Sequence, residues 1–291
     1  MINALTIDIE DYFHVAAFEK HIRSEDWDNY SLRVDDNTAR ILDLLDAFSV
    51  KATFFVLGWV AKRRPLLVKE IQRRGHEIAC HGYGHKLIYK IGFDEFRKDV
   101  KKAKTLIEDI CGQQIVGFRA PSYSITNQSL WALDILVEEG FTYDSSIFPV
   151  MHDIYGISDA CRFPNEIKRP SGVIKEFPLS TLQINLARLR YHLPIAGGGY
   201  LRLFPVWFIK KAMDHINNIE KQPTVIYFHP WEIDADQPRV KASIKSRFRH
   251  YVNLDKTVSK IEYLLTHFDF SPMHEIIDGH LNTGENMSKT C

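Results

Sequence analysis

Residues 52–80 read ATFFVLGWVAKRRPLLVKEIQRRGHEIAC and contain one full unit of strand, helix and strand. The apolar, β-prone run over 52–57 predicts a buried strand. Pro65 suits the first turn of a helix over 65–74, and Gly75 suits its end. A second short strand is expected over 76–80. This order is typical of a parallel sheet whose strands are joined by helices.

The same alternation continues on both sides of this unit. A strand over 4–9 and a helix over 38–48 are expected before it. The elements expected after it are a helix over 94–110, a strand over 115–118, a helix over 128–139, strands over 141–143 and 224–228, a helix over 254–268 and a short apolar strand near the C-terminus. The sequence therefore predicts an α/β fold, most simply a single (β/α) barrel that is distorted or incomplete.

One stretch interrupts this alternation. Between about 149 and 222 the rhythm weakens, and this part of the chain holds several prolines and the triplet at 197–199 of three glycines. We interpret about 150–222 as an insertion that decorates the barrel mouth. The barrel domain is expected to span 1–280, and the polar residues 281–291 are expected to form a frayed tail.

The overall composition, 45% hydrophobic and 25% charged, is that of a globular protein. Lys+Arg and Asp+Glu both total 37, so no overall field would attract nucleic acid. The start, MINALTIDIEDYF, lacks the features of a signal peptide, and no apolar run of about 18 residues follows. We therefore expect a cytoplasmic protein, at most peripheral at the inner membrane face. The cysteines, which form no CxxC pair and are expected to be reduced, are Cys80, Cys111, Cys161 and Cys291.

The most specific local pattern is His81-Gly-Tyr-Gly-His85, directly after the strand expected over 76–80. Two imidazoles four residues apart, with glycines that let the backbone turn, can face one metal ion. A catalytic zinc site usually has three protein ligands and leaves one position for water or substrate. The alternative is that both histidines lie in a loop and bond to backbone groups.

Three acids lie at the end of the first expected strand, in the run Ile-Asp8-Ile-Glu10-Asp11. They repel one another unless a cation or an arginine offsets their charge. Strand alternation places Glu10 on the same side as Asp8, whereas Asp11 joins them only if the strand has already turned. The alternative is a solvated acidic turn.

Further polar residues follow other expected strands. Arg119, Asp144 and His229 each lie at the C-terminal end of such a strand, as Asp8 and His81 do. Each of them alone is more often a structural or surface residue. Because the C-terminal ends of the strands form the catalytic face of a barrel, we expect these five residues to share one site.

At this point the sequence resembles the polysaccharide deacetylase superfamily, the NodB-homology carbohydrate esterases. The resemblance covers about 4–148 and the surroundings of His229. The motifs that carry it, in the family's order, are ATFFVLG, GHEIACHGYGH, FRAPSYS and YDSSIFP. The segments EFPLS, AGGGYLRL, YFHPWEID and RFRHYVNLDKT resemble the branch associated with exopolysaccharide and exosortase loci.

The resemblance implies a set of catalytic roles. Asp8 would be the general base, and Arg119 would hold it. His229 would be the general acid, and Asp144 would orient it. The backbone N–H of Ser122 would stabilise the oxyanion.

It also implies one divalent ion, with zinc favoured and cobalt or nickel able to substitute. The ligands would be His81, His85 and an acid of the first motif. The family commonly has two adjacent aspartates there, or two separated by one residue, so Asp11 is preferred as third ligand and Glu10 is the alternative. Tyr123 is expected beside the substrate.

The implied activity is hydrolysis of the N-acetyl group of an amino sugar, in a polysaccharide or its lipid-linked precursor. A same-fold amidohydrolase acting on a cyclic imide or ureide is one alternative. A catalytically silent carbohydrate-binding protein is the other, although a binding protein does not need both a base and an acid.

Residues 177–213 contain no Asp or Glu but are rich in cations and large apolar side chains. One interpretation is a helix that buries its aromatic residues in the core. The other is a surface for phosphate-bearing, lipid-linked glycans near a membrane. The residues concerned are Arg188, Arg190, Leu201, Arg202, Phe204, Trp207, Phe208, Lys210 and Lys211.

Overall fold

The fold is built on one mostly parallel sheet. A computed structural model describes residues 1–152, 154–186 and 189–282 of the chain. The neighbouring strands follow the order β10-β1-β2-β3-β4-β5-β7-β6, and β11 also pairs with β1. The strands are β1 (Ile2–Ile9), β2 (Thr53–Val56), β3 (Glu77–Cys80), β4 (Gly117–Phe118), β5 (Tyr143–Asp144), β6 (Asn165–Arg169), β7 (Gly172–Glu176), β10 (Val225–Phe228) and β11 (Asp269–Ser271). Among these described strands, only β6 runs antiparallel to its neighbour.

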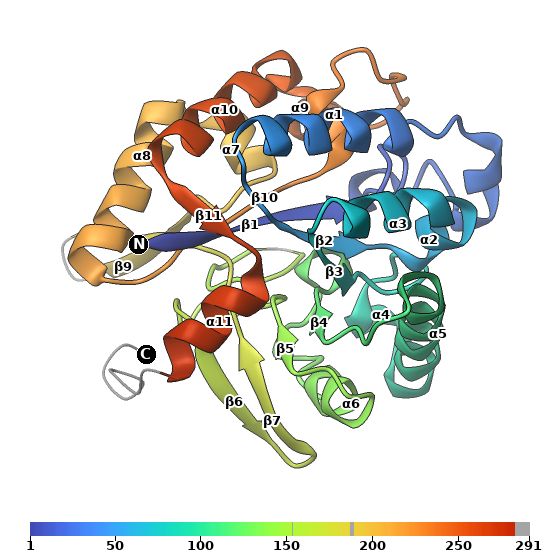
Figure 1. The fold of residues 1–291 in the computed structure, drawn as a ribbon, viewed down its shortest axis with the longest axis horizontal. Helices are drawn as coiled ribbons and strands as arrows, with labels where there is room; N and C mark the ends of the chain where they lie inside the picture. Colours follow the sequence, from blue (N-terminus) through green and yellow to red (C-terminus); the bar gives the residue numbers. More distant parts are fainter. Residues whose placement is uncertain (153, 187–188, 283–291) are drawn as a thin grey trace.

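Helices surround this sheet and join most of its parallel strands (Figure 1). They are α1 (Val34–Ala47), α2 (Gly58–Arg63), α3 (Pro65–Arg73), α4 (Ile88–Ile91), α5 (Phe93–Cys111), α6 (Ala132–Glu138), α7 (Gly199–Leu203), α8 (Val206–His215), α9 (Ile244–Tyr251), α10 (Thr257–His267) and α11 (Met273–Asn282). The α/β class and the expected order of strands and helices up to β5 are confirmed.

Both faces of the sheet are buried. Along the strands, Leu5 and Phe54 pack in the larger apolar cluster, which includes the surrounding helices. Their neighbours Ala4 and Phe55 pack in a second, smaller cluster. Two buried faces explain why these strands read as continuous apolar runs rather than as an alternating pattern.

The sheet does not close into a regular barrel within the described residues. Strands β7 and β10 are not paired, and irregular backbone lies between them. The N–H of Ile195 donates to the Ser180 carbonyl at 3.2 Å, and the N–H of Tyr227 donates to the Ala196 carbonyl at 2.7 Å. An incomplete barrel was expected, and the gap lies at this position.

The region at 150–222 is only partly an insertion. Strand β7 pairs in parallel with β5, so it belongs to the main sheet. A separate hairpin of β8 (Thr181–Leu186) and β9 (Leu189–Pro194) lies outside that sheet. Short strands with few apolar residues, such as β6 with its sequence NEIKR, leave little periodic signal.

The structure corrects two further expectations, one about the cysteines and one about the C-terminal tail. Cys161 is disulfide-bonded, whereas Cys80 and Cys111 are free, so the expectation of reduced thiols is wrong for Cys161. Helix α11 ends at Asn282, two residues into the expected polar tail, and the rest of that tail lies outside the described residues. Within the described part of the chain, no helix is both long enough and apolar enough to cross a membrane.

Candidate active site

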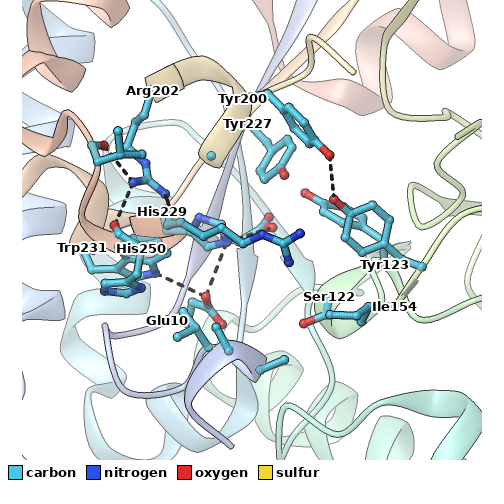
Figure 2. Close-up of a pocket in the computed structure, with 18 of the residues that line it drawn as sticks. Glu10, Ser122, Tyr123, Ile154, Tyr200, Arg202, Tyr227, His229, Trp231 and His250 are labelled. Atoms are coloured by element: carbon cyan, nitrogen blue, oxygen red, sulfur yellow. Dashed lines mark hydrogen bonds and ion pairs between the residues drawn. The ribbon is translucent and has the colours of Figure 1, made fainter. Parts of the chain in front are cut away.

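A cavity of about 480 Å³ opens where the C-terminal ends of β1, β3 and β10 meet. Its lining includes Asp8, Glu10, His81, His85 and His229. Figure 2 shows the cavity with Glu10 and His229 labelled. The structure therefore brings the strand-end residues of three separate motifs into one site, as the barrel topology predicts.

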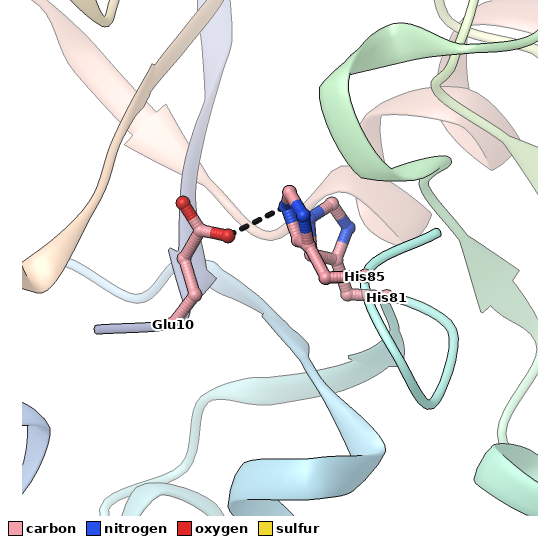
Figure 3. Close-up of side chains that lie close together, drawn as sticks. All are labelled: Glu10, His81 and His85. Carbon is pink, nitrogen blue, oxygen red and sulfur yellow. Dashed lines mark ion pairs between the residues drawn. The ribbon is translucent and has the colours of Figure 1, made fainter. Parts of the chain in front are cut away.

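Glu10, His81 and His85 form a compact group of ligand atoms (Figure 3). Their nearest ligand atoms all lie within 4.8 Å of one another. The Oε2 atom of Glu10 is 2.7 Å from Nε2 of His85. Imidazole and carboxylate ligands of this number suit a divalent metal with one open position.

The protonation states of His81 and Glu10 favour metal binding. Burial lowers the pKa of His81 to about 4, so its imidazole is neutral at pH 7. Its Nδ1 atom lies 2.8 Å from the Arg119 carbonyl, which orients the ring and leaves Nε2 for another partner. Burial alone would raise the pKa of Glu10, but the charges of His85 and His229 outweigh burial and hold that pKa well below its ordinary value. Glu10 is therefore an ionised carboxylate.

Asp11 does not join this group, which corrects the preference for Asp11 over Glu10. Its Oδ2 atom accepts hydrogen bonds from the N–H groups of Arg33 and Val34, at 2.6 and 2.9 Å. Its Oδ1 atom accepts from its neighbour Tyr12 at 2.9 Å. Asp11 therefore caps the start of α1. The side-chain alternation of the strand continues as far as Glu10, so Glu10 lies on the same side as Asp8.

Asp8 is held by a buried arginine. Its Oδ1 atom lies 2.8 Å from Nη1 of Arg119, and neither side chain is more than 2% exposed. Arg119 also donates to Thr6 Oγ1 at 2.8 Å and to Ser145 Oγ at 3.0 Å. Because these bonds fix the guanidinium in place, Asp8 keeps one orientation and its other oxygen faces the cavity side, 3.9 Å from Nε2 of His229.

His229 lies beside Asp8, and each of its two ring nitrogens is close to a glutamate. Its Nδ1 atom is 2.6 Å from Oε1 of Glu232. Its Nε2 atom is 3.4 Å from Oε1 of Glu10. Burial alone would lower the pKa of His229, but the negative charges of Glu10 and Glu232 outweigh burial and raise it to about 9. His229 therefore carries a proton at neutral pH.

The partner of His229 is Glu232, not Asp144 as expected. Asp144 instead belongs to a separate buried pair with Glu176, its register partner on β7. Burial raises the pKa of Asp144 to about 6 and that of Glu176 well above its usual range, so the two carboxyls hold a proton between them. Ser146 Oγ also donates to Asp144 Oδ1 at 2.5 Å.

Two residues of the site were missed from sequence. Glu232 follows His229 by three residues in the run HPWE, a spacing that could have indicated it. Arg202 gave no such signal. Its Nε atom donates to Glu232 Oε2 at 2.6 Å, and its Nη2 atom donates to the carbonyl of Arg249 at 2.9 Å in α9. Arg202 is 2% exposed, so it is a buried structural cation.

The remaining wall of the cavity is aromatic. Tyr123, Tyr200 and Tyr227 lie together on the side away from Trp231 (Figure 2). The rings of Tyr123 and Tyr227 are 5.1 Å apart and steeply inclined to each other. Ser122 also lines the cavity, and its φ of 51° places it in the left-handed region, which is uncommon outside functional turns.

The basic, apolar stretch at 177–213 fits the core interpretation only in part, because Phe204 and Phe208 are partly buried. Leu201, Ile209 and Met213 are buried, and Lys210 pairs with Asp214 at 2.7 Å. Trp207 is 57% exposed. Arg188 lies outside the described residues. A membrane or lipid contact by this stretch stays a prediction.

Comparison with known families agrees with this geometry. Residues 26–141 match the family described as polysaccharide deacetylase. This part of the chain is similar to the polysaccharide deacetylase family. Residues 145–278 match a domain of unknown function, DUF3473. The resemblance to the superfamily is therefore confirmed, while the narrower branch stays a prediction. The polysaccharide deacetylase match covers His81, His85 and Arg119, and the DUF3473 match covers His229 and Glu232.

Curated relatives cover part of the chain. A peptidoglycan-N-acetylglucosamine deacetylase of Bacillus cereus is 38% identical over 98 residues, which are 33% of this chain and 36% of that protein. A chitooligosaccharide deacetylase of Sinorhizobium fredii is 33% identical over 99 residues, which are 34% of this chain and 44% of that protein. The matched part thus spans less than half the length of these relatives.

Solved structures show the same fold over nearly the whole chain. A provisionally named polysaccharide deacetylase from Mycobacterium smegmatis aligns with a TM-score of 0.62 and 21% identity, covering 98% of this chain and 91% of that one. Puue allantoinase aligns with a TM-score of 0.61 and 15% identity, with the same coverages. The two scores are nearly equal, so the fold alone does not separate the two activities.

Proposed function

We propose that this protein is a metal-dependent deacetylase that hydrolyses the N-acetyl group of an amino sugar, in a polysaccharide or its lipid-linked precursor, and releases acetate. One observation carries the proposal. Asp8, held by Arg119, and His229, held by Glu232, lie 3.9 Å apart, and His229 is 3.4 Å from Glu10 of the Glu10, His81 and His85 group. Hydrolysis of an amide needs such a base and such an acid.

The charges of the site fit a bound cation. Asp8 pairs with Arg119, and Glu232 pairs with Arg202. Among the described residues, no lysine or arginine pairs with Glu10, which is 2% exposed. The partners of Glu10 are imidazoles, which are also ligands for a divalent ion, so Glu10, His81 and His85 could hold such an ion in place of that pairing. Zinc is the favoured ion, and cobalt or nickel could substitute.

When bound, the ion would polarise the acetyl carbonyl and acidify a water molecule. The chain's own residues then move the protons. Asp8 accepts the proton of the attacking water. The N–H of Ser122 donates to the developing oxyanion. His229 donates its proton to the sugar nitrogen, because an amine is too basic to leave without protonation.

The test is acetate release from N-acetylglucosamine oligomers, with and without a chelator. We expect release by the wild type, loss on chelation and recovery with added zinc. Asp8→Asn should fold and keep its metal but lose activity. Asp11→Asn is the matched control, because Asp11 is a neighbouring buried carboxylate that faces away from the site. A chain that instead hydrolyses a cyclic ureide or imide and releases no acetate would contradict the proposal.

The metal site has a separate test. Metal analysis of His81→Ala and His85→Ala should show less bound ion than the wild type, with one ion per chain in the wild type. Undiminished metal content in both variants would remove the basis for the site.

A further inference from the structure

Helix α9 forms one side of the catalytic cavity and carries two cations into its lining. Lys245 and Arg249 are four residues apart, so they lie on the same face of the helix. Both line the cavity, together with Phe248 between them in sequence. All three side chains are exposed to solvent. Any glycan long enough to extend out of the cavity on this side meets them.

The charge here is one-sided. Residues 239–249, RVKASIKSRFR, hold five cations and no acid, although the whole chain has equal numbers of both. Among the residues that the structure describes, no carboxylate lies within ion-pair distance of Lys245, Arg247 or Arg249. Surface cations elsewhere are often paired, as Arg63 is with Asp28. The positive charge of α9 is therefore free to meet a ligand.

The helix is fixed in place at the cavity. Arg202 donates to the carbonyls of Arg249, His250 and Val252, at 2.9, 2.7 and 3.0 Å. These bonds cap the C-terminal end of α9 with a buried cation. The same arginine holds Glu232, so α9 keeps a constant position relative to His229. A binding surface that is ordered before the ligand arrives loses less entropy on binding.

Arg249 also acts across the cavity. Burial raises the pKa of the Tyr155 hydroxyl, and the positive charge of Arg249 opposes this rise. Tyr155 belongs to the aromatic wall, where its hydroxyl is 3.4 Å from that of Tyr200. The cavity thus has an aromatic wall, suited to the apolar face of a sugar ring, and a cationic wall near it.

We infer that Lys245 and Arg249 bind an anionic group, a phosphate or a carboxylate, carried by the glycan close to its N-acetylated sugar. This inference rests on the proposed function, and it narrows the substrate to an anionic N-acetylated glycan. A neutral glycan could only accept hydrogen bonds from these two cations, whereas an anionic group would also gain the charge attraction. Charge-assisted contacts to phosphate or carboxylate are stronger than neutral hydrogen bonds.

An anionic membrane is the competing ligand, because Ile244 is 86% exposed and Phe248 is 58% exposed. The glycan is favoured because Lys245 and Arg249 line the cavity itself. A membrane would need only outward-facing cations, such as Arg247, which lines a separate shallow groove with Ile244.

The test compares N-acetylglucosamine with N-acetylglucosamine 1-phosphate, which differ by one phosphate. We expect the wild type to show a kcat/KM about tenfold or more higher for the phosphate compound, mostly through a lower KM. The double variant Lys245→Glu with Arg249→Glu should bring the ratio close to one. The matched control is Lys98→Glu with Lys101→Glu, two exposed lysines of α5 with the same change in net charge, and it should leave the ratio unchanged.

Binding is measured in parallel by calorimetry with both sugars, on protein freed of metal by a chelator so that phosphate cannot bind an ion. Equal affinity for both sugars in the wild type would overturn the inference, as would an unchanged preference in the α9 double variant. If the α9 double variant no longer sediments with phosphatidylglycerol vesicles but keeps the phosphate preference of the wild type, α9 binds a membrane instead. If neither sugar releases acetate but the phosphate preference in binding is present and depends on α9, the proposed function fails and the anion site stands.

Discussion

Replacing Glu232 by glutamine tests the pairing that makes His229 an acid. Glu232 is fully buried, and its Oε1 atom lies 2.6 Å from Nδ1 of His229. The glutamine side chain would keep the shape and a hydrogen-bond acceptor but remove the negative charge. Since a nearby opposite charge favours the protonated imidazole, we expect the pKa of His229 to fall from about 9 by roughly 1 to 2 units. The charge of Asp8 remains, so the fall is partial.

The consequence depends on pH. With a pKa of about 9, His229 is about 90% protonated at pH 8, and with a pKa near 7 it is about 10% protonated. Activity on an N-acetyl sugar should therefore fall roughly tenfold at pH 8 but little at pH 6, where both forms are protonated. General damage to the fold would lower activity at every pH.

The assay is the rate of acetate release between pH 5 and about 10 for the wild type and Glu232→Gln. The alkaline limb of the profile should move to lower pH in the variant. Glu138→Gln is the control, because Glu138 is a surface carboxylate that pairs with Arg97 away from the cavity. Circular dichroism at each pH shows whether the variant is folded, since Arg202 loses its partner. An alkaline limb at the same pH in both proteins would refute the assignment of Glu232.

Three further outcomes follow from the same geometry. Glu10→Gln should lose the divalent ion, whereas Asp11→Asn should keep it and lose about 1 kcal/mol of stability at the start of α1; normal metal content in Glu10→Gln would contradict the ligand assignment. His229→Ala should be far less impaired on an acetate ester of an activated phenol than on an N-acetyl sugar, because a good leaving group needs little protonation, and equal losses would exclude the general-acid role. The pKa of Asp144 is raised to about 6, so its proton stabilises the fold fully below about pH 4, and this stabilisation is lost as the pH rises to about 6. The free energy of unfolding should therefore depend less on pH over this range in Asp144→Asn than in the wild type. The same pH dependence in both proteins would argue against the buried acid pair.

Much of the sheet could be predicted from the sequence because its signals are local. The parallel strands β1, β2 and β3 are short apolar runs, and Pro65 and Gly75 mark the ends of α3, the second of the two helices between β2 and β3. The sequence also predicted that Asp8, His81 and His229 share one site. Each of them follows a strand, and parallel strands have their C-terminal ends at one edge of the sheet. Strand β7 was missed because its position depends on pairing with β5, and its own sequence, GVIKE, is only partly apolar.

The details of the site were decided by the tertiary structure. The choice between Glu10 and Asp11 depended on where the chain turns, and Asp11 turns away because the N–H groups at the start of α1 need an acceptor. The partner of His229 depended on distances across the fold, since the strands that lead into Asp144 and His229, β5 and β10, are not neighbours in the sheet. The role of Arg202 could not be found from sequence, where it was only one cation of the stretch at 177–213, because the carbonyls that it binds lie about fifty residues further along the chain. Local periodicity determines strands and helices, but the partners of buried charges are set by which distant segments the fold brings into contact.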